Sequence, residues 1–278
     1  MSYGPNPWQQ AHWDWRAAGN FICGGAGSGL LVFAALAGVD GLAGTLLVLA
    51  GLGLVGLGLL CVWLEIGRPW RAINVFRRPG ASWMTREAMV SVLLFGLGLG
   101  VAAGLRTWAP LLMFAALGFV YCQGRIVQAG KGIPLWREPL TVWLLVATGL
   151  VEGAGLFWLS AVPPARGAAL LPLLFAALVV ARWLLWRTWR ARVAPGAVPQ
   201  ALAAIDGPGR AIEWLGGVAP LVLALVASTG LAWAPQLLAL AGAMAAGTGV
   251  MFKFTLITRA AFNQGFRLDR LPVRGVAR

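Results

Sequence analysis

Charged side chains are scarce in this chain. They make up 11% of its 278 residues, whereas 59% are hydrophobic. A soluble domain carries about 25% charged residues, and the mean hydropathy here is +0.78. The deficit excludes a water-soluble fold and predicts an all-α, polytopic membrane protein. The net charge of +13 does not indicate nucleic acid, because the arginines lie between apolar segments and fit membrane topology and anionic lipid headgroups better.

Ligands for a resident redox centre are also scarce. His12 is the single histidine, and the three cysteines at positions 23, 61 and 122 form no C-x-x-C motif. A haem held by two histidines and a cluster held by four cysteines are therefore excluded, and we expect no haem or metal in this chain. The N-terminal segment is polar and aromatic, so we expect no cleavable signal peptide, and the first span would target the chain to the membrane.

Eight apolar segments long enough to cross a membrane follow one another along the chain. The expected spans cover residues 17–39, 43–64, 88–104, 108–121 (extended to 127), 140–162, 168–186, 211–231 and 235–255. They predict one integral membrane domain over residues 1–278, with both termini on the same side. Two polar connections stand out at residues 65–87 and 187–210. The glycines in the first two spans, including the Gly25–Gly29 pair of a GxxxG motif, favour close helix packing.

Positive charge is distributed unevenly between the two sides. The side of the termini holds 20 of the 22 Lys and Arg residues, and the other side holds Arg106 and Arg166. Cytoplasmic loops carry the excess of positive charge. We therefore predict that the termini and both polar connections are cytoplasmic, in a bacterial inner membrane. Counting about 1.5 Å of helix rise per residue places Arg182 and Lys253 near the cytoplasmic ends of their spans, where they can snorkel to the surface. Lys253 can also face a pocket there.

Two of the nine carboxylates lie at this predicted cytoplasmic boundary. Glu65 follows the second span and Glu87 precedes the third, so one connection brings both to the membrane surface. Burial favours the protonated form of a carboxyl group, which suits a proton donor to a quinone. Alternatively, both glutamates pair with Arg68, Arg71 or Arg86 and only fix the connection. His12, Trp13 and Asn20 precede the first span on the same side and either line the same pocket or anchor the chain.

Glu152 differs because it lies inside the fifth span. Counting from Leu140 at about 1.5 Å per residue places it roughly 18 Å into the membrane. Intramembrane carboxylates suggest function, such as a proton relay. The alternative is a protonated Glu152 that bonds to a neighbouring helix.

Two runs carry a resemblance to a known family: HWDWRAAGNFICGGAGSGL and LEIGRPWRAINVFRRPGASWMTREA. They resemble the DmsC group within the NrfD-like membrane anchors of molybdopterin oxidoreductases, and the resemblance covers most of the sequence. Two later runs, YCQGRIVQAGKGIPLWREP and KFTLITRAAFNQGFRLDRLPVRG, are most similar to the anchor of phenylacetyl-CoA:acceptor oxidoreductases, PadD.

The resemblance implies a haem-free anchor that binds a quinone, menaquinone or ubiquinone, beside an iron–sulfur electron-transfer subunit. It also implies a catalytic subunit with molybdopterin carrying molybdenum or tungsten. The position matching Glu87 is linked to quinone handling in DmsC anchors, so that role carries over. The position matching Glu65 is commonly histidine there, although Glu can also donate a proton and a hydrogen bond. We expect the quinone pocket or the partner dock to include His12, Trp13, Asn20, Arg68, Trp83, Arg86 and Lys253.

The topology bears on the choice of reaction. Dimethyl sulfoxide reductases work outside the cytoplasmic membrane, whereas the charge bias here places the docking surface inside. A CoA thioester is confined to the cytoplasm, so phenylacetyl-CoA oxidation with quinone reduction agrees with the topology, and a cytoplasmic sulfite-oxidising complex agrees equally well. A secondary transporter and a scaffold without a quinone site are the alternatives from other classes; the lack of a detectable inverted repeat argues against the transporter.

Overall fold

The computed structural model describes residues 3–65, 74, 80, 82–165, 167 and 170–266. Within these residues the regular structure is helical, and the part described contains eight helical segments long and apolar enough to cross a membrane. The predicted all-α, eight-span class is confirmed. The bounds are α1 Trp15–Ala37, α2 Gly41–Glu65, α3 Trp83–Ala102, η2 Arg106–Trp108, α4 Ala109–Ala129, α5 Pro134–Arg137, α6 Leu140–Leu159, α7 Leu170–Val193, α8 Pro199–Glu213, η3 Trp214–Val218, α9 Ala219–Ala227 and α10 Ala234–Thr258.

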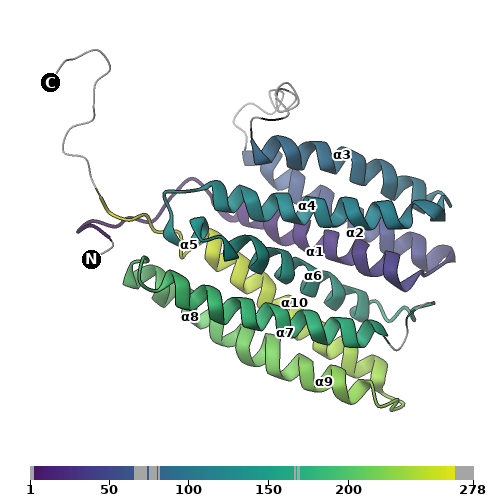
Figure 1. Cartoon of the computed structure of the whole chain (residues 1–278). Helices are drawn as coiled ribbons and strands as arrows, with labels where there is room; N and C mark the ends of the chain where they lie inside the picture. Colours follow the sequence, from purple (N-terminus) through teal and green to yellow (C-terminus); the bar gives the residue numbers. More distant parts are fainter. Residues whose placement is uncertain are drawn as a thin grey trace.

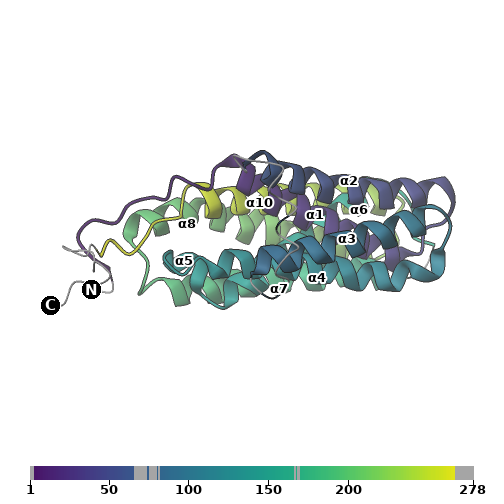
Figure 2. The same cartoon turned by 90° about the horizontal axis from the view of Figure 1, so that it is seen from above.

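The helices form two halves that meet along α1 and α6. Figure 1 shows α1 to α4 on one side and α6 to α10 on the other, with α7, α8 and α9 at the outer edge. The segments before α1 and after α10 run side by side at one end (Figure 2), where Gly4 N donates to Gln264 O at 2.7 Å and Asn263 N donates to Trp8 O at 3.0 Å. We call this the termini end. The cytoplasmic placement of this end stays a prediction.

Glycines set the contact between the two halves. A Cβ atom added to Gly29 or Gly153 would collide with the backbone of the facing helix, because Gly29 on α1 packs directly on Gly149 and Gly153 of α6. Small residues allow lipid-embedded helices to approach this closely and gain van der Waals contact. The predicted GxxxG contact of α1 is therefore confirmed, and its partner is a second GxxxG pair on α6.

The prediction of a long polar connection at residues 187–210 is wrong, because the connection is much shorter. Residues 187–193 continue α7, and residues 199–210 belong to α8, so only residues 194–198 separate the two helices. The arginines at the end of α7 complement the helix dipole and reach solvent. The prolines hid the helical period of α8, whose buried face comprises Ala201, Ile205, Gly209 and Ile212. At the other connection, α3 begins at Trp83, so Glu87 is a helical residue.

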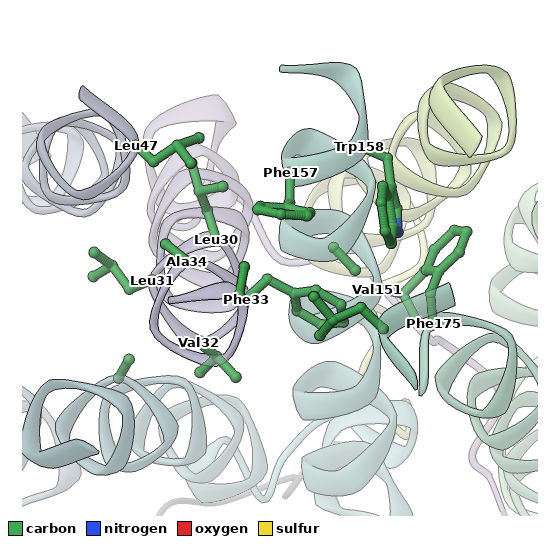
Figure 3. Close-up of a cluster of buried hydrophobic side chains, with 14 of the residues drawn as sticks. Leu30, Leu31, Val32, Phe33, Ala34, Leu47, Val151, Phe157, Trp158 and Phe175 are labelled. Atoms are coloured by element: carbon green, nitrogen blue, oxygen red, sulfur yellow. The ribbon is translucent and has the colours of Figure 1, made fainter. Parts of the chain in front are cut away.

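The interior contains two apolar clusters at different levels. One lies toward the end opposite the termini and centres on α1 and α6, where the Phe33 and Phe157 ring centroids are 6.2 Å apart (Figure 3). The other lies toward the termini end and includes Phe21, Trp136, Trp189 and Phe252. Along α1, α4, α6, α7 and α10, the two clusters are separated by a stretch that contributes small or polar side chains.

Candidate functional site

A layer of buried polar side chains lies between the two apolar clusters and, at Asn20, reaches the level of the cluster at the termini end. Each member is less than a tenth exposed. We call it the polar layer; its members are Asn20, Glu87, Gln123, Thr148, Glu152, Arg182, Thr248 and Lys253. Buried polar groups are costly in a membrane protein and mark functional or specific structural contacts. The layer divides into two clusters, one around Glu87 and one around Glu152.

The first cluster joins α1, α3 and α4. Asn20 Nδ2 donates to Glu87 Oε1 at 3.4 Å, and Gln123 Nε2 donates to the Asn20 carbonyl at 2.9 Å. The Gln123 amide also faces the Glu87 carboxyl. Among the described residues, Glu87 forms no ion pair and Asn20 Oδ1 has no hydrogen-bond partner. Glu87 is therefore a buried carboxyl held by neutral amides, with spare hydrogen-bonding capacity beside it.

An aromatic and cationic patch covers this cluster toward the termini end. The guanidinium groups of Arg86 and Arg125 lie 4.2 and 4.4 Å from the Trp83 ring centroid. Tyr121 meets the same ring edge-on at 5.9 Å, and Arg125 Nη1 donates to its hydroxyl at 3.3 Å. Arg86 stacks on Trp83 and makes no ion pair with Glu87. The alternative in which Arg86 pairs with Glu87 is therefore wrong. Arg68 and Arg71, the other arginines of that alternative, lie outside the described residues.

The second cluster contains a buried ion pair. Lys253 Nζ lies 2.6 Å from Glu152 Oε2 and donates to the Phe21 carbonyl at 2.9 Å. Arg182 donates to the carbonyls of Ala245 and Gly216, the second of which lies in the π-helical turn η3. Glu152 is within electrostatic reach of Arg182, so one carboxylate faces two buried cations. Glu152 Oε1 and Arg182 Nε have no hydrogen-bond partner among the described residues.

The expectation that Arg182 and Lys253 snorkel to the surface is wrong. Their exposed fractions are 0% and 1%. The residue count placed both near helix ends, but the helix face decides their environment, and both faces point into the bundle. The carbonyl groups and Glu152 supply there the partners that water would supply at the surface. Two of the twenty cations assigned to the termini side are therefore interior.

The two clusters meet at α1. Glycines on this helix make room for both, since a side chain at Gly24 would collide with the Gln123 amide and one at Gly25 would collide with the Lys253 ammonium. The position of a Gly25 Cβ also lies 3.6 Å from Gln123 Oε1, so the end of Gln123 and the end of Lys253 are neighbours. The sequence GGAGSG thus provides space for polar side chains from other helices.

Glu65 lies apart from Glu87 in its contacts. It ends α2 half-buried, in the electrostatic field of Asp14 and Arg16. Arg16 Nη1 donates to the Leu64 carbonyl at 3.0 Å and Arg16 pairs with Asp14 at 2.9 Å. Hydrogen bonds from the Arg16 side chain and backbone hold the pKa of Asp14 below its usual value. The structure therefore gives the two predicted proton donors separate neighbours.

The N-terminal residues predicted for the pocket separate as well. His12 is exposed, whereas Trp13 stacks on Trp136 with ring centroids 4.8 Å apart and packs against Phe21 in the apolar cluster of the termini end. Sequence reasoning missed Gln123 and Arg125; polar side chains inside the apolar fourth span were the available signal. In the described part of the chain, no group of three or more His, Cys, Asp or Glu residues is arranged to hold a metal ion.

Similarity to known proteins extends from the second span into the sixth. Residues 42–189 match the model of the family described as "DMSO reductase anchor subunit (DmsC)". This sequence is also 25% identical over 123 residues to the C chain of the anaerobic dimethyl sulfoxide reductase of Haemophilus influenzae. That match covers 40% of this sequence and 43% of the relative, so less than half of the relative's length is spanned. The matched family region contains Glu87, Gln123, Glu152 and Arg182. Because the family match covers more than half of the sequence, the protein belongs to the family of DMSO reductase anchor subunits.

Proposed function

We propose that this protein is the quinone-binding membrane anchor of a molybdopterin and iron–sulfur oxidoreductase. The observation that carries the proposal is the buried Glu87 carboxyl, held by Asn20 and Gln123 and by no cation in the described part of the chain. Reduction of a quinone to a quinol consumes two electrons and two protons. The partner's iron–sulfur subunit would supply the two electrons. Glu87 would donate one proton to a quinone oxygen and, once reprotonated from the termini end, would donate the second.

The hydrogen-bonding groups fit both forms of the substrate. A quinone carbonyl accepts hydrogen bonds, and a protonated Glu87 and the Asn20 amide can donate them. A quinol hydroxyl is a donor, and Asn20 Oδ1 is a buried acceptor without a partner among the described residues. After Glu87 gives its proton to the quinone, it would be reprotonated from the termini end. We assign this end to the cytoplasm because of its positive charge.

Glu65, His12 and the arginine patch have secondary roles in this proposal. At the termini end, Glu65 is half-buried and His12 is exposed. Both can pass protons from water to Glu87. Arg86 and Arg125, stacked on Trp83, present cations toward the surface on which the iron–sulfur subunit would dock. We propose that Lys253 and Glu152 fix the wall of the pocket, because their ion pair ties α6 and α10 to α1 at Phe21.

The Glu87→Gln variant tests the quinone role. The complex should assemble, and electron transfer from the catalytic subunit to a soluble dye should be unchanged. Turnover with a quinone analogue should fall about 100-fold, the lower range for loss of a positioned general acid. Asp40→Asn is a matched control, because Asp40 pairs with Arg106 at the opposite end. Unchanged quinone turnover in Glu87→Gln would exclude the proton-donor role.

The partner's reaction follows from the resemblance and the charge bias. We propose that the copurifying large subunit oxidises phenylacetyl-CoA in the cytoplasm, with a cytoplasmic sulfite-oxidising complex as the second candidate. Affinity purification of the tagged protein, followed by dye-linked assays with phenylacetyl-CoA and with sulfite, separates the two. A protein that purifies without molybdopterin and iron–sulfur subunits would contradict the anchor function and favour a transporter.

A further inference from the structure

A basic cleft lies between α7 and α8 at the outer edge of the bundle, away from Glu87. Its volume is about 430 Å³. Trp186 forms its floor, and Gly209 lets the two helices close over this ring, since any side chain at Gly209 would collide with the indole. The charged residues that line the cleft are Arg187, Arg190, Asp206, Arg210 and Glu213.

The cleft has cations available for a ligand. Arg190 is occupied by Asp206, with Nε to Oδ1 at 2.6 Å and Nη2 to Oδ2 at 3.0 Å. Arg187 and Arg210 are exposed, and among the described residues neither has a carboxylate within ion-pair distance. Glu213 is the second carboxylate of the lining and forms no ion pair in the described part of the chain. The three arginines of the cleft outnumber its two carboxylates, so the cleft keeps a net positive charge that favours an anion.

The two arginines lie at the same depth. Arg187 is about 26 Å along the helix from Leu170, where α7 begins, and Arg210 is about 26 Å back from Ala227, where α9 ends. The hydrocarbon core of a bilayer is about 30 Å thick. Both side chains therefore reach the headgroup level at the termini end, whereas the last turn of α7 and the first turns of α8 extend beyond it.

The surface below the cleft suits acyl chains. Leu184, three residues before Arg187, is 55% exposed, and Trp214, four residues after Arg210, is 65% exposed, so each lies on the helix face of its arginine. Tryptophan favours the membrane–water interface. In Figure 1, α7, α8 and α9 form the outer edge of the bundle, so this face meets lipid.

We propose that the α7–α8 cleft binds the phosphate headgroup of an anionic phospholipid. Arg187 and Arg210 would hold the phosphate, and the acyl chains would lie along Leu184 and Trp214. An acidic protein surface is the less favoured occupant, because the cleft opens on a lipid-facing edge at headgroup depth. Lipid binding here requires membrane insertion alone and is independent of the quinone function.

Native mass spectrometry of the delipidated full-length protein tests the site, with phosphatidylglycerol and phosphatidylcholine as probes. Phosphatidylglycerol should bind at least tenfold more tightly. Arg187→Gln and Arg210→Gln should each weaken it about fivefold, and the double variant about 30-fold, as expected for about 1 kcal/mol per arginine. Arg106→Gln, which removes the same charge at the opposite end, should leave binding unchanged.

Three outcomes would overturn the proposal. They are equal binding of the two lipids, full phosphatidylglycerol binding by the double glutamine variant, and retention of inorganic phosphate as tightly as of the lipid. Loss of copurifying subunits from the double variant with unchanged lipid binding would assign the cleft to a protein partner instead. If the glutamine variants do not fold, the Arg187→Lys, Arg210→Lys variant keeps both charges and should still prefer phosphatidylglycerol.

Discussion

Glu87 and Glu152 are both buried in the polar layer, yet their surroundings are opposite. Glu87 has two neutral amides beside it, from Asn20 and Gln123. Glu152 is paired with the Lys253 ammonium at 2.6 Å and lies near Arg182. The same side chain, at similar burial, thus occupies a neutral environment in one half of the protein and a charged environment in the other.

The difference separates two uses of a buried carboxyl. A carboxyl among amides can carry a proton into a dry site and release it, because no fixed cation opposes the neutral form. A carboxyl paired with an ammonium forms a contact that is costly to break, because removing one partner leaves the other buried without compensation. We therefore assign chemistry to Glu87 and a tie between helices to Glu152, which leaves its proton-relay role as the less favoured proposal.

The largest effect should come from breaking the ion pair. Lys253→Met leaves Glu152 facing Arg182 alone and frees the Phe21 carbonyl, and it should lower the free energy of unfolding by about 3–5 kcal/mol. Unfolding in mixed micelles measures the loss. Glu152→Gln combined with Lys253→Met should be less destabilising than Lys253→Met alone. Glu87→Gln is the matched carboxyl control and should change stability by less than about 1 kcal/mol. Equal losses in Lys253→Met and Glu87→Gln would remove the distinction between the two clusters.

The next largest effect should come from displacing α1, the helix at which the two polar clusters meet. In Gly153→Ala the new Cβ would overlap the backbone of Gly29, so α1 must shift away from α6. We expect a loss of about 1–3 kcal/mol, typical of overpacking, together with slower quinone turnover, because α1 carries Asn20. Gly96→Ala is the control, since a Cβ at Gly96 meets nothing within 4 Å. A variant that loses stability and keeps full turnover would show that the Glu87 cluster is independent of the α1–α6 contact.

Hydropathy predicted the eight spans because membrane crossing depends on length and apolarity, which can be read from one dimension. It failed for α8, where Pro208 and three charged residues hid a helix whose apolar face is its main burial signal. The candidate site was predicted in part. The positions of Asn20 and Glu87 near span ends indicated a shared pocket, and they meet.

The pairing of Lys253 with Glu152 and the position of Gln123 could not be predicted in the same way. Lys253 and Gln123 both lie in predominantly apolar spans, and their role depends on which helix face packs inward and on which residue of a distant helix lies opposite. The gap of 101 residues between Glu152 and Lys253 leaves no local pattern to find. The separation of Glu65 from Glu87 likewise depends on the contact of α2 with Arg16 across 48 residues.

A smaller effect should follow from removing one amide of the Glu87 cluster. Gln123→Leu deletes the donor to the Asn20 carbonyl and the amide beside Glu87. The loss of one hydrogen bond corresponds to about 1 kcal/mol, so we expect quinone turnover to fall by about fivefold to tenfold with dye-linked activity unchanged. Gln128→Leu, on the same helix nearer the termini end, serves as the control. If both glutamine variants behave alike, the amide neighbourhood of Glu87 does not explain its role.

The smallest expected effect concerns Asp14, which lies outside the polar layer. Asp14 caps α1 by accepting from Arg16 N at 2.8 Å and pairs with the Arg16 side chain. Asp14→Asn keeps a capping side chain and removes the charge, so we expect a loss of only a few tenths of a kcal/mol near pH 7, as for an exposed ion pair.

The pH dependence of that small loss gives its cause. The pKa of folded Asp14 is lowered from 3.8 by the Arg16 hydrogen bonds. A lowered folded pKa contributes stability above the unfolded value and loses it as the pH falls through the folded value. The melting difference between the wild-type protein and Asp14→Asn should therefore be constant from about pH 8 to pH 5, decline as the pH falls through 3.8, and vanish only below the lowered folded pKa. A melting difference that grows on acidification would show that the Asp14–Arg16 pair is not its cause. Because Arg16 also bonds to Leu64 O at the end of α2, the same titration reports on the α1–α2 contact beside Glu65 and leaves the Glu152 cluster untouched.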